Sequence, residues 1–347
     1  MAENPPLIDV KDLHTYFHLA EGVVHAVDGV NLTIKQKQTM GIVGESGCGK
    51  SITGYSMMRL VPPPGKIESG EILFYRPEQT DQGIASAEMI NITRLDPNGR
   101  EIRDIRGNSI SMVFQEPMTA MSPVRTVGQQ IIEVIILHQK LGKAEAREKA
   151  IDMLLRVKMS RPEKVIDDYP FQLSGGMRQR AMIAMALSCR PNLLIADEPT
   201  TALDVTTEAQ ILNLMRELQE EFGMAIMYIT HNLGVIAEMA DEVAVMYMGR
   251  VVEQTDVRSI FFNPLHPYTR GLLSSIPSLS DALAESRQQK RLNVIKGMVP
   301  DPYNRLKGCP FHPRCPNFIE RVCDQVEPPV VQVDSRHVVK CHLYGER

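Results

Sequence analysis

The sequence lacks any apolar run of the roughly 18 residues that a membrane-spanning helix requires. Its most apolar stretch, residues 131–137 of the 347-residue chain, is short and contains Glu133. The first six residues, Met-Ala-Glu-Asn-Pro-Pro, offer neither a basic region nor an apolar core. We therefore expect no membrane span and no secretory signal peptide, and we expect a cytosolic protein.

The sequence also lacks an excess of positive charge. Lys and Arg number 38 against 42 Asp and Glu, which leaves a formal net charge of −4. This balance does not favour nucleic acid or an anionic membrane as a partner. Because cytosolic thiols stay reduced, the six cysteines are not expected to form a disulfide framework.

The composition that remains is that of an ordinary globular protein, with 43% hydrophobic and 23% charged residues. Its length favours about two domains. Apolar runs that indicate strands alternate with segments of helical periodicity. This alternation favours an α/β fold in which helices cover a largely parallel sheet.

The expected elements can be placed by their residue ranges. Strands are expected at Leu7–Val10, Val27–Ile34, Thr39–Val43, Glu71–Tyr75, Ile110–Phe114, Leu193–Ala196 and Ala225–Thr230, with a hairpin of Val243–Met248 and Arg250–Val252 around Gly249. Helices are expected at Ser51–Leu60, Gly175–Cys189, Thr207–Phe222 and Leu233–Ala240, and within Val127–Met159. Residues 76–100 are polar and contain Pro and Gly, which predicts an irregular surface insertion.

A glycine-rich segment between the third strand and the first helix predicts a phosphate-binding loop. Residues 44–51 match the pattern G-x-x-x-x-G-K-[ST] in full: Gly44, Glu45, Ser46, Gly47, Cys48, Gly49, Lys50 and Ser51. Glycine lets backbone N–H groups turn inward around a phosphate. Lys50 supplies a positive charge to the β- and γ-oxygens, and the Ser51 hydroxyl is a candidate Mg²⁺ ligand. We interpret Cys48 as a small filler.

A second motif is the apolar strand at residues 193–196 that ends in two carboxylates. Asp197 at the strand end is a candidate for holding Mg²⁺ through water. Glu198 is then placed to polarise an attacking water as general base. The two motifs together predict hydrolysis of a nucleoside triphosphate.

A third motif, Leu-Ser-Gly-Gly-Met-Arg-Gln-Arg at residues 173–180, lies about 20 residues before the acidic strand. With this combination the sequence resembles the ATP-binding cassette (ABC) ATPases, whose signature is LSGGQ-like. Met177 stands where Gln is commonest. The resemblance extends from about Leu7 to Val252 and implies a P-loop NTPase fold, RecA-like, with a helical subdomain at about 118–180.

The resemblance implies further site residues. Gln115 matches the Q-loop, as nucleotide contact and Mg²⁺ ligand, and His231 matches the switch histidine. Residues 202–204, Ala-Leu-Asp, match the D-loop. Phe17 matches the aromatic residue that stacks on adenine, with Tyr16 as the competing choice. The full set of expected nucleotide contacts is Phe17, residues 44–51, Ile52, Gln115, Ser174, Gly175, Gly176 and Asp204.

The resemblance also implies that one chain cannot complete its own site. A helix start preceded by Gly-Gly presents N–H groups and a positive dipole end. In the family Ser174, Gly175 and Gly176 therefore face the γ-phosphate of ATP held by a partner cassette, and two cassettes close around two nucleotides. Residues 1–260 are accordingly expected to form the nucleotide-binding domain.

Residues 261–347 are expected to form a C-terminal extension. The segment Asn263–Leu273, with its His-Pro-Tyr, looks like the one after the cassette in oligopeptide, dipeptide and nickel importers. Four cysteines follow, Cys309, Cys315, Cys323 and Cys341. Four clustered thiols suggest a metal site, and the absence of C-x₂-C suits an Fe–S cluster at least as well as zinc. Dipeptide-importer ATPases that resemble this chain carry a [4Fe–4S] cluster at a similar set, including Pro-Arg-Cys-Pro around Cys315. Inert thiols remain an alternative.

These resemblances predict the ATP-hydrolysing subunit of a di- or oligopeptide importer, peripheral to the cytoplasmic face of the cell membrane. The expected partners are a second, related ABC ATPase, two permease subunits and an extracytoplasmic substrate-binding protein. Oligosaccharide or nickel import by the same kind of machine is the alternative. A non-transport cassette ATPase acting on DNA is disfavoured, since the interval from Lys50 to Ser174 is too short for a coiled-coil insertion.

Overall fold

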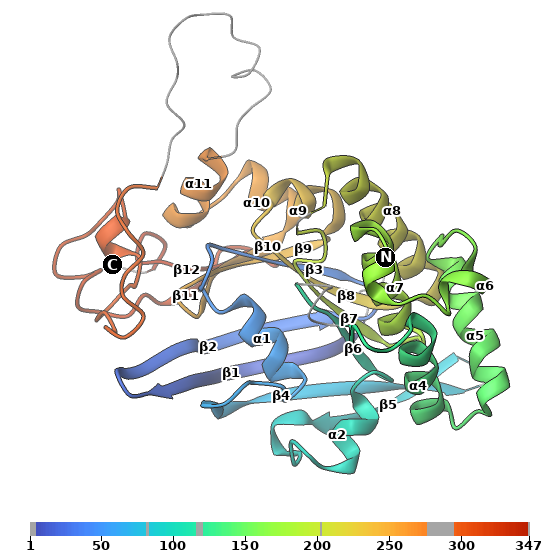
Figure 1. Ribbon diagram of the computed structural model, residues 1–347. Coiled ribbons are helices and arrows are strands. Elements are labelled where there is room, and N and C mark those ends of the chain that lie inside the picture. The colour runs from blue at the N-terminus through green and yellow to red at the C-terminus, as the bar shows by residue number, and fades with distance from the viewer. Residues whose placement is uncertain (1–4, 81–82, 116–120, 202, 276–294, 346–347) are drawn as a thin grey trace, which may run out of the picture.

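The computed structural model describes residues 5–80, 83–115, 121–201, 203–275 and 295–345. Two sheets and a set of helices form layers (Figure 1). A four-stranded antiparallel sheet has the order β2-β1-β4-β5, and an eight-stranded sheet has the order β11-β12-β10-β9-β3-β8-β7-β6. Figure 1 shows the smaller sheet below the larger one and helices α8 to α11 above it. In the described part of the chain no helix is long and apolar enough to cross a membrane.

The strands have the following bounds: β1 Pro6–Leu19, β2 Gly22–Lys35, β3 Thr39–Val43, β4 Gly65–Thr80, β5 Gly83–Asn91, β6 Ile110–Val113, β7 Leu193–Asp197, β8 Ala225–Thr230, β9 Glu242–Tyr247, β10 Arg250–Asp256, β11 Val330–Gln332 and β12 Val338–Lys340. The helices are α1 Lys50–Met57, α2 Arg100–Ile105, α4 Val127–Gln139, α5 Lys143–Arg156, α6 Pro162–Val165, α7 Gly175–Leu187, α8 Val205–Phe222, α9 Leu233–Met239, α10 Val257–Phe262 and α11 Pro267–Ser274.

The centre of the larger sheet is parallel, as the alternating pattern predicts. Strands β6, β7, β8, β3 and β9 pair in parallel, whereas β10, β12 and β11 add on in antiparallel fashion. The sheet is therefore mixed, and the expectation of a largely parallel sheet holds only for its centre. The expected hairpin around Gly249 is present as β9 and β10.

Alternation along the central strands separates two apolar clusters. Met227 and Ile229 of β8 pack with β1, β2, β4 and α1 between the two sheets. Ile226 and Tyr228, which point the other way, pack with helices α4, α5, α7, α8 and α9. Because the strands are buried on both faces, their sequences are mostly apolar and they have little freedom to shift register.

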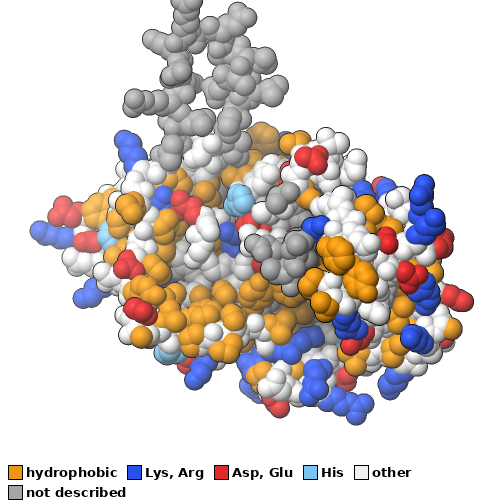
Figure 2. All heavy atoms as spheres, viewed as in Figure 1, with side chains coloured by type: hydrophobic (Ala, Val, Ile, Leu, Met, Phe, Trp, Pro, Cys, Tyr) orange, Lys and Arg blue, Asp and Glu red, His pale blue; other side chains and the backbone are white. Residues whose placement is uncertain are grey.

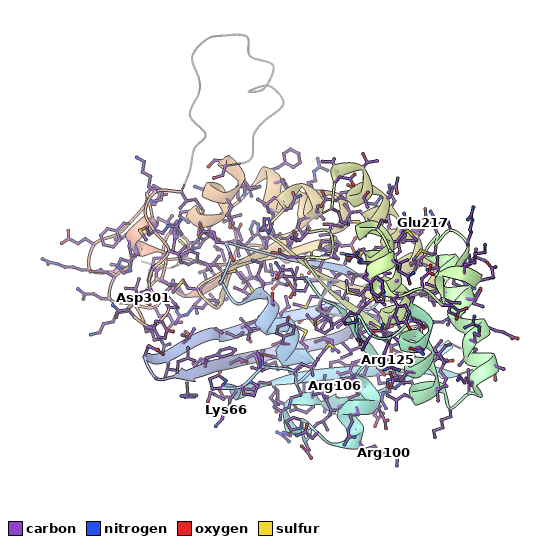
Figure 3. All side chains as sticks on the ribbon, in the orientation of Figure 1. Lys66, Arg100, Arg106, Arg125, Glu217 and Asp301 are labelled. Atoms are coloured by element: carbon purple, nitrogen blue, oxygen red, sulfur yellow. The ribbon has the colours of Figure 1, made fainter. Side chains whose placement is uncertain are left out.

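The interpretation of residues 76–100 as an irregular insertion is wrong. Strands β4 and β5 pair from Leu73 and Asn91 outward to Thr80 and Gly83 and form a hairpin, which α2 follows. The Pro and Gly residues misled the prediction, because Pro77 lies on β4 beyond Phe74, the last residue paired with β1, and Gly83 pairs with Thr80 at the end of the hairpin. Arg106, just after α2, donates to the carbonyl oxygens of Met58 (2.7 Å) and Arg59 (2.8 Å) and ties this hairpin to the end of α1 (Figure 3).

The strands β1 and β2 are also longer than predicted, since each has 14 residues where Leu7–Val10 and Val27–Ile34 were expected. Outside the predicted ranges apolar residues such as Leu13 and Phe17 are mixed with polar ones, and register shifts between Val10 and Leu13 and between Thr15 and Tyr16 interrupt the alternation. In Figure 2 charged side chains of both signs lie mostly around the rim of the face shown, with hydrophobic side chains nearer its centre.

Candidate functional site

The glycine-rich loop lies between β3 and α1, in the context that the motif requires. All five residues of β3 are buried, so the strand holds the start of the loop rigidly. Gly49 has a φ of +97°, and a Cβ added there would lie 2.0 Å from the carbonyl oxygen of Ala26. At Gly44 a Cβ would lie 2.2 Å from the carbonyl oxygen of Met246. Both positions therefore exclude any side chain.

Lys50 and Ser51 begin α1 beneath this loop. The Lys50 Nζ is buried and donates to the carbonyl oxygens of Gly44 (2.8 Å) and Glu45 (3.1 Å). The Ser51 hydroxyl donates to Asp197 Oδ1 at 2.9 Å. The structure thus brings together the serine and the aspartate that two separate motifs predicted as Mg²⁺ ligands. Burial raises the pKa of Asp197, the Glu198 charge adds to this, and the Ser51 hydrogen bond opposes it.

Glu198 contacts two other predicted site residues, Gln115 and His231. Gln115 Nε2 donates to Glu198 Oε2 at 3.0 Å, and Nδ1 of His231 lies 2.9 Å from Oε1. The Thr201 hydroxyl, which the sequence did not single out, donates to Oε2 at 3.1 Å. Gln115, Glu198 and His231 follow β6, β7 and β8, and parallel neighbouring strands end at the same edge of a sheet.

The electrostatics keep Glu198 in its carboxylate form. Burial alone would raise its pKa, but the hydrogen bond and charge of His231 outweigh burial and lower it. The Glu198 side chain is 13% exposed, whereas that of His231 is 65% exposed.

Glu198 also has a φ of +44°, a strained conformation for a residue with a side chain. Its backbone N–H donates to Ile229 at 2.9 Å, which helps to hold that conformation.

A cavity of about 230 Å³ lies over the loop. Its predicted lining residues are Ser46, Gly47, Gly49, Lys50, Ser51, Ile52, Gln115 and Glu198. Gly44, Glu45 and Cys48 belong to the loop but do not line the cavity. Burial raises the pKa of the Cys48 thiol, which fits its interpretation as a filler.

Three stretches that the sequence did not mark as site residues complete the cavity wall. They are Val24, His25, Ala26 and Asp28 of β2, Met248, Gly249 and Arg250 at the turn from β9 to β10, and Pro302, Asn304, Arg305, Leu306 and Pro310 of the C-terminal segment. No local pattern marks these residues, because they reach the cavity only through tertiary folding. A nucleotide in this cavity would contact residues more than 250 positions apart in sequence.

Phe17 does not line the cavity. It pairs with Val24 of β2 and Gly65 of β4, and its half-buried ring lies against Gly65. The competing Tyr16 has its ring centroid 3.9 Å from that of His25, which does line the cavity.

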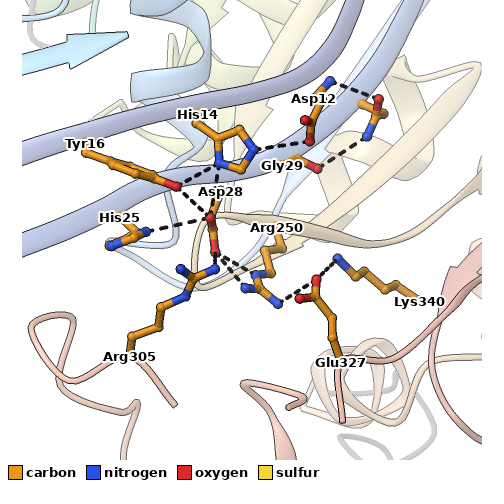
Figure 4. Close-up of polar contacts among 11 residues, drawn as sticks. Asp12, His14, Tyr16, His25, Asp28, Gly29, Arg250, Arg305, Glu327 and Lys340 are labelled. Atoms are coloured by element: carbon orange, nitrogen blue, oxygen red, sulfur yellow. Dashed lines mark hydrogen bonds and ion pairs between the residues drawn. The ribbon is translucent and has the colours of Figure 1, made fainter. Parts of the chain in front are cut away.

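Asp28 of β2 connects the cavity wall to the C-terminal segment (Figure 4). Its Oδ2 accepts from Arg250 at 2.7 and 3.0 Å and from Arg305 at 3.2 Å, and its Oδ1 accepts from the Tyr16 hydroxyl at 3.0 Å. The Asp28 side chain is only 5% exposed. Burial would raise its pKa, but Arg250 and then Arg305 hold the pKa well below its usual range.

The residues predicted to face a partner's nucleotide lie outside this cavity. Ser174 caps α7 and accepts from the Met177 N–H at 3.3 Å. Asp204 caps α8, accepting from the Thr207 N–H at 3.0 Å. A Cβ on Gly176 would lie 2.7 Å from Thr207, so the two helix starts are adjacent. Ala202, the first residue of the expected D-loop, is outside the described residues.

Four thiols lie near one another in the C-terminal segment. Burial, together with the charges of Cys341, Cys315 and Cys323, raises the pKa of Cys309 to about 11. The Cys309 N–H donates to the Cys323 carbonyl at 2.8 Å, and all four are free thiols. Within the described ranges no three His, Cys, Asp or Glu side chains are arranged to hold a single metal ion.

Comparisons with known families and curated proteins follow the same division of the chain. The family "ABC transporter" matches residues 27–201, and "Oligopeptide/dipeptide transporter, C-terminal region" matches residues 252–323. The oligopeptide transport ATP-binding protein AppD of Bacillus subtilis is 47% identical over 98% of this chain and 97% of its own length. The probable peptide ABC transporter ATP-binding protein y4tR of Sinorhizobium fredii is 46% identical over 100% and 98%.

Solved structures give the same result for the fold. A dimeric post-hydrolysis state of the ATP-binding cassette MJ0796, bound to ADP and Pi, has a TM-score of 0.61 and 28% identity. The match covers 73% of this chain and 99% of that one. The cassette of cbiO1 from Clostridium perfringens, part of a cbiONQ transporter complex, matches with a TM-score of 0.58 and 28% identity over 75% and 92%.

Proposed function

The chain belongs to the ABC transporter family, and from that membership we propose that it binds and hydrolyses ATP to drive the import of di- or oligopeptides. The observation that carries the proposal is that Lys50, Ser51, Gln115 and Glu198 line one cavity. Asp197 joins this set through its hydrogen bond with Ser51, and His231 joins it through its contact with Glu198. Relatives named for peptide transport, similar over nearly their whole length, support the cargo class.

The phosphate end of the site follows from the loop. Lys50 Nζ exchanges its carbonyl partners for β- and γ-phosphate oxygens when ATP enters. The oxygens of Ser51, Asp197 and Gln115 suit Mg²⁺, which prefers hard oxygen ligands. When bound, Mg²⁺ offsets the negative charge of the phosphate oxygens.

The hydrolytic step uses Glu198 as general base. Its carboxylate accepts a proton from the attacking water, and Gln115 and Thr201 orient it from the Oε2 side. His231 contacts Glu198 through Nδ1, which leaves the exposed Nε2 for a γ-phosphate oxygen. Ser174, Gly175 and Gly176 act on the ATP of a partner cassette, in keeping with the dimeric cassette bound to ADP and Pi.

The decisive substitution is Glu198→Gln. Glutamine keeps the shape but cannot accept the proton, so MgATP still binds, turnover falls by at least about 100-fold, and two cassettes stay closed around nucleotide. Phosphate release and mass by light scattering measure these effects. Lys50→Ala is the matched control, because it weakens nucleotide binding itself. Unchanged turnover in Glu198→Gln would contradict the assignment.

The proposed partners are a second, related ATPase, two permease subunits and an extracytoplasmic binding protein, with this chain on the cytoplasmic face of the membrane. Reconstitution with these subunits tests the cargo. Uptake of labelled di- and oligopeptides supports the proposal, whereas uptake of only an oligosaccharide or nickel identifies the alternative. Full ATP hydrolysis by this chain in the absence of any permease subunit would favour a non-transport ATPase.

We further propose that Cys309, Cys315, Cys323 and Cys341 bind a [4Fe–4S] cluster as a structural staple. The mutual proximity of four buried or half-buried thiols supports it, and thiolate is the donor that such clusters require. When bound, the cluster would cross-link four positions of a segment with few core residues.

Metal analysis tests this site. Anaerobically purified protein is expected to contain about four iron atoms per chain and to be brown. Cys315→Ser removes most of the iron, whereas the matched control Cys189→Ser, at a buried cysteine outside the segment, keeps it. A colourless protein with one zinc per chain would support the zinc alternative instead.

A further inference from the structure

The His-Pro-Tyr segment at residues 266–268 reaches the phosphate-binding loop. The Glu45 N–H donates to the Tyr268 hydroxyl at 2.8 Å, across 223 residues of sequence. Glu45 follows Gly44 directly and precedes the loop residues that line the cavity. The hydroxyl thus fixes one loop amide, and neither Glu45 nor Tyr268 lines the cavity.

Arg314 holds the side chain of the same residue. Its Nη1 and Nη2 donate to Glu45 Oε2 (2.7 Å) and Oε1 (3.0 Å), a paired geometry that restricts both position and orientation. The Arg314 side chain is 5% exposed. The hydrogen bond with Glu45 raises the pKa of Arg314, so the guanidinium stays charged.

The two anchoring residues are themselves rigidly held. Arg314 lies over the rings of Tyr247 and Phe311, with its Cζ 5.9 and 6.0 Å from their centroids. Tyr268 packs against the same two rings at 4.6 and 5.4 Å. His266 caps α11 by accepting from the Tyr268 N–H at 3.0 Å. The contact to Glu45 therefore comes from a packed base.

A phosphate-binding loop gains affinity when its N–H groups already point inward before the anion arrives. Any reordering at the moment of binding costs part of the interaction energy. Glu45 is held at its N–H by Tyr268 and at its carboxylate by Arg314, while its carbonyl accepts from Lys50. These contacts define one backbone conformation at the start of the loop.

We propose that Arg314, together with Tyr268, is a positioning residue that preorganises the phosphate-binding loop for the β-phosphate of MgATP. The inference rests on the proposed function and adds two residues of the C-terminal segment to it. Arg314 directly precedes Cys315, so the segment that carries the four thiols also carries the anchor of the loop. The extension is then part of the nucleotide site.

The test measures MgATP affinity in the full chain, with Glu198→Gln present to prevent turnover. Arg314→Met removes the charge but keeps much of the length, and we expect the Kd to rise about tenfold. Arg314→Lys keeps the charge without the paired geometry and restores part of the affinity. Arg321→Met, at an exposed arginine of the same segment, is the matched control and leaves the Kd unchanged.

Two further measurements separate positioning from folding. With Glu198 intact, Arg314→Met is expected to raise the KM for ATP while kcat stays within about twofold, because bound nucleotide reorders the loop. In a double-mutant cycle, Arg314→Met and Glu45→Gln together weaken binding no more than the stronger single change. Tyr268→Phe removes only the hydroxyl acceptor and is expected to weaken MgATP binding about threefold. If the Arg314 variants fail to fold, the MgATP affinity of this variant still tests the proposal.

The outcomes are distinct. Wild-type affinity in both Arg314→Met and Tyr268→Phe would overturn the inference, as would additive effects of Arg314→Met and Glu45→Gln. A loss of affinity that only follows a loss of folded protein would do the same. Failure of the unsubstituted chain to bind MgATP would contradict the proposed function itself.

Discussion

At the scale of single residues, Asp28 shows what local sequence cannot reveal. It sits in a strand with no motif around it, yet it accepts from Arg250, Arg305 and Tyr16 (Figure 4). Its partners lie up to 277 residues away. By contrast, Lys50, Ser51 and Glu198 were predictable, because phosphate chemistry imposes short-range patterns on the chain.

Replacing Asp28 should expose the cost of an unpaired buried cation. Asp28→Asn keeps the shape but leaves Arg250 with Glu327 as its described carboxylate partner. We expect the free energy of unfolding at pH 7 to fall by about 3 kcal/mol. Urea denaturation measures it. Asp12→Asn, at a carboxylate that is 77% exposed, is the matched control and should change stability by less than about 0.5 kcal/mol. Equal stability of the two variants would argue against the pairing.

At the scale of elements, the sequence predicted the buried central strands and the long helices but not the hairpin of β4 and β5. Strands β3, β7 and β8 are short, buried at every residue and apolar except at one end, so their burial is visible in composition alone. The pairing of β4 with β5 includes cross-strand partners such as Arg76 and Glu88. The hydrophobic pattern of the sequence does not predict which residues pair in this way. Strands β11 and β12 were missed for the same reason.

His266, the N-cap residue of α11, makes the free energy of unfolding depend on pH. Burial, with a smaller contribution from the charge of Arg270, lowers the pKa of His266 to about 3. Between pH 6.5 and 3 the His266 imidazole is therefore protonated in the unfolded chain but neutral in the folded chain. Above pH 6.5 His266 does not reduce the free energy of unfolding. Below pH 6.5 it lowers the free energy of unfolding by up to about 1.4 kcal/mol per pH unit.

His266→Asn should remove that dependence, since Asn can accept from the Tyr268 N–H but does not titrate. At pH 7 we expect the variant to be less stable by about 2 kcal/mol, because a buried ring is lost. At pH 5 the difference from wild type should narrow by about 2 kcal/mol. Denaturant titrations at both pH values measure this. A difference that stays constant would mean that His266 is not held neutral.

At the scale of the whole molecule, the C-terminal segment is built into the body of the protein. Strand β12 pairs with β10 and extends the larger sheet, and His337 contacts the buried Glu253 at 2.7 Å. Figure 1 shows residues 295–345 gathered at one end of both sheets. The sequence predicted an extension there, but not that it would complete the sheet and the cavity wall.

Removing that segment should therefore affect distant parts of the chain. A chain that ends at residue 300 loses β11, β12, Arg305 and Arg314. We expect a lower Tm and faster amide hydrogen exchange at residues 44–49. A chain that ends at residue 345 is the control and should match the full chain. Unchanged exchange at the loop in the shorter chain would show that the segment folds apart from it.

The contact between Glu45 and Arg314 spans 269 positions and has a consequence for synthesis. The ribosome adds residue 314 long after residue 45. Throughout that interval the nascent loop lacks Arg314 as the partner of its carboxylate, and it reaches its mature form only once residue 314 has left the exit tunnel. Truncated mRNAs that end before the codon for residue 314 would therefore yield largely folded chains that bind nucleotide slowly.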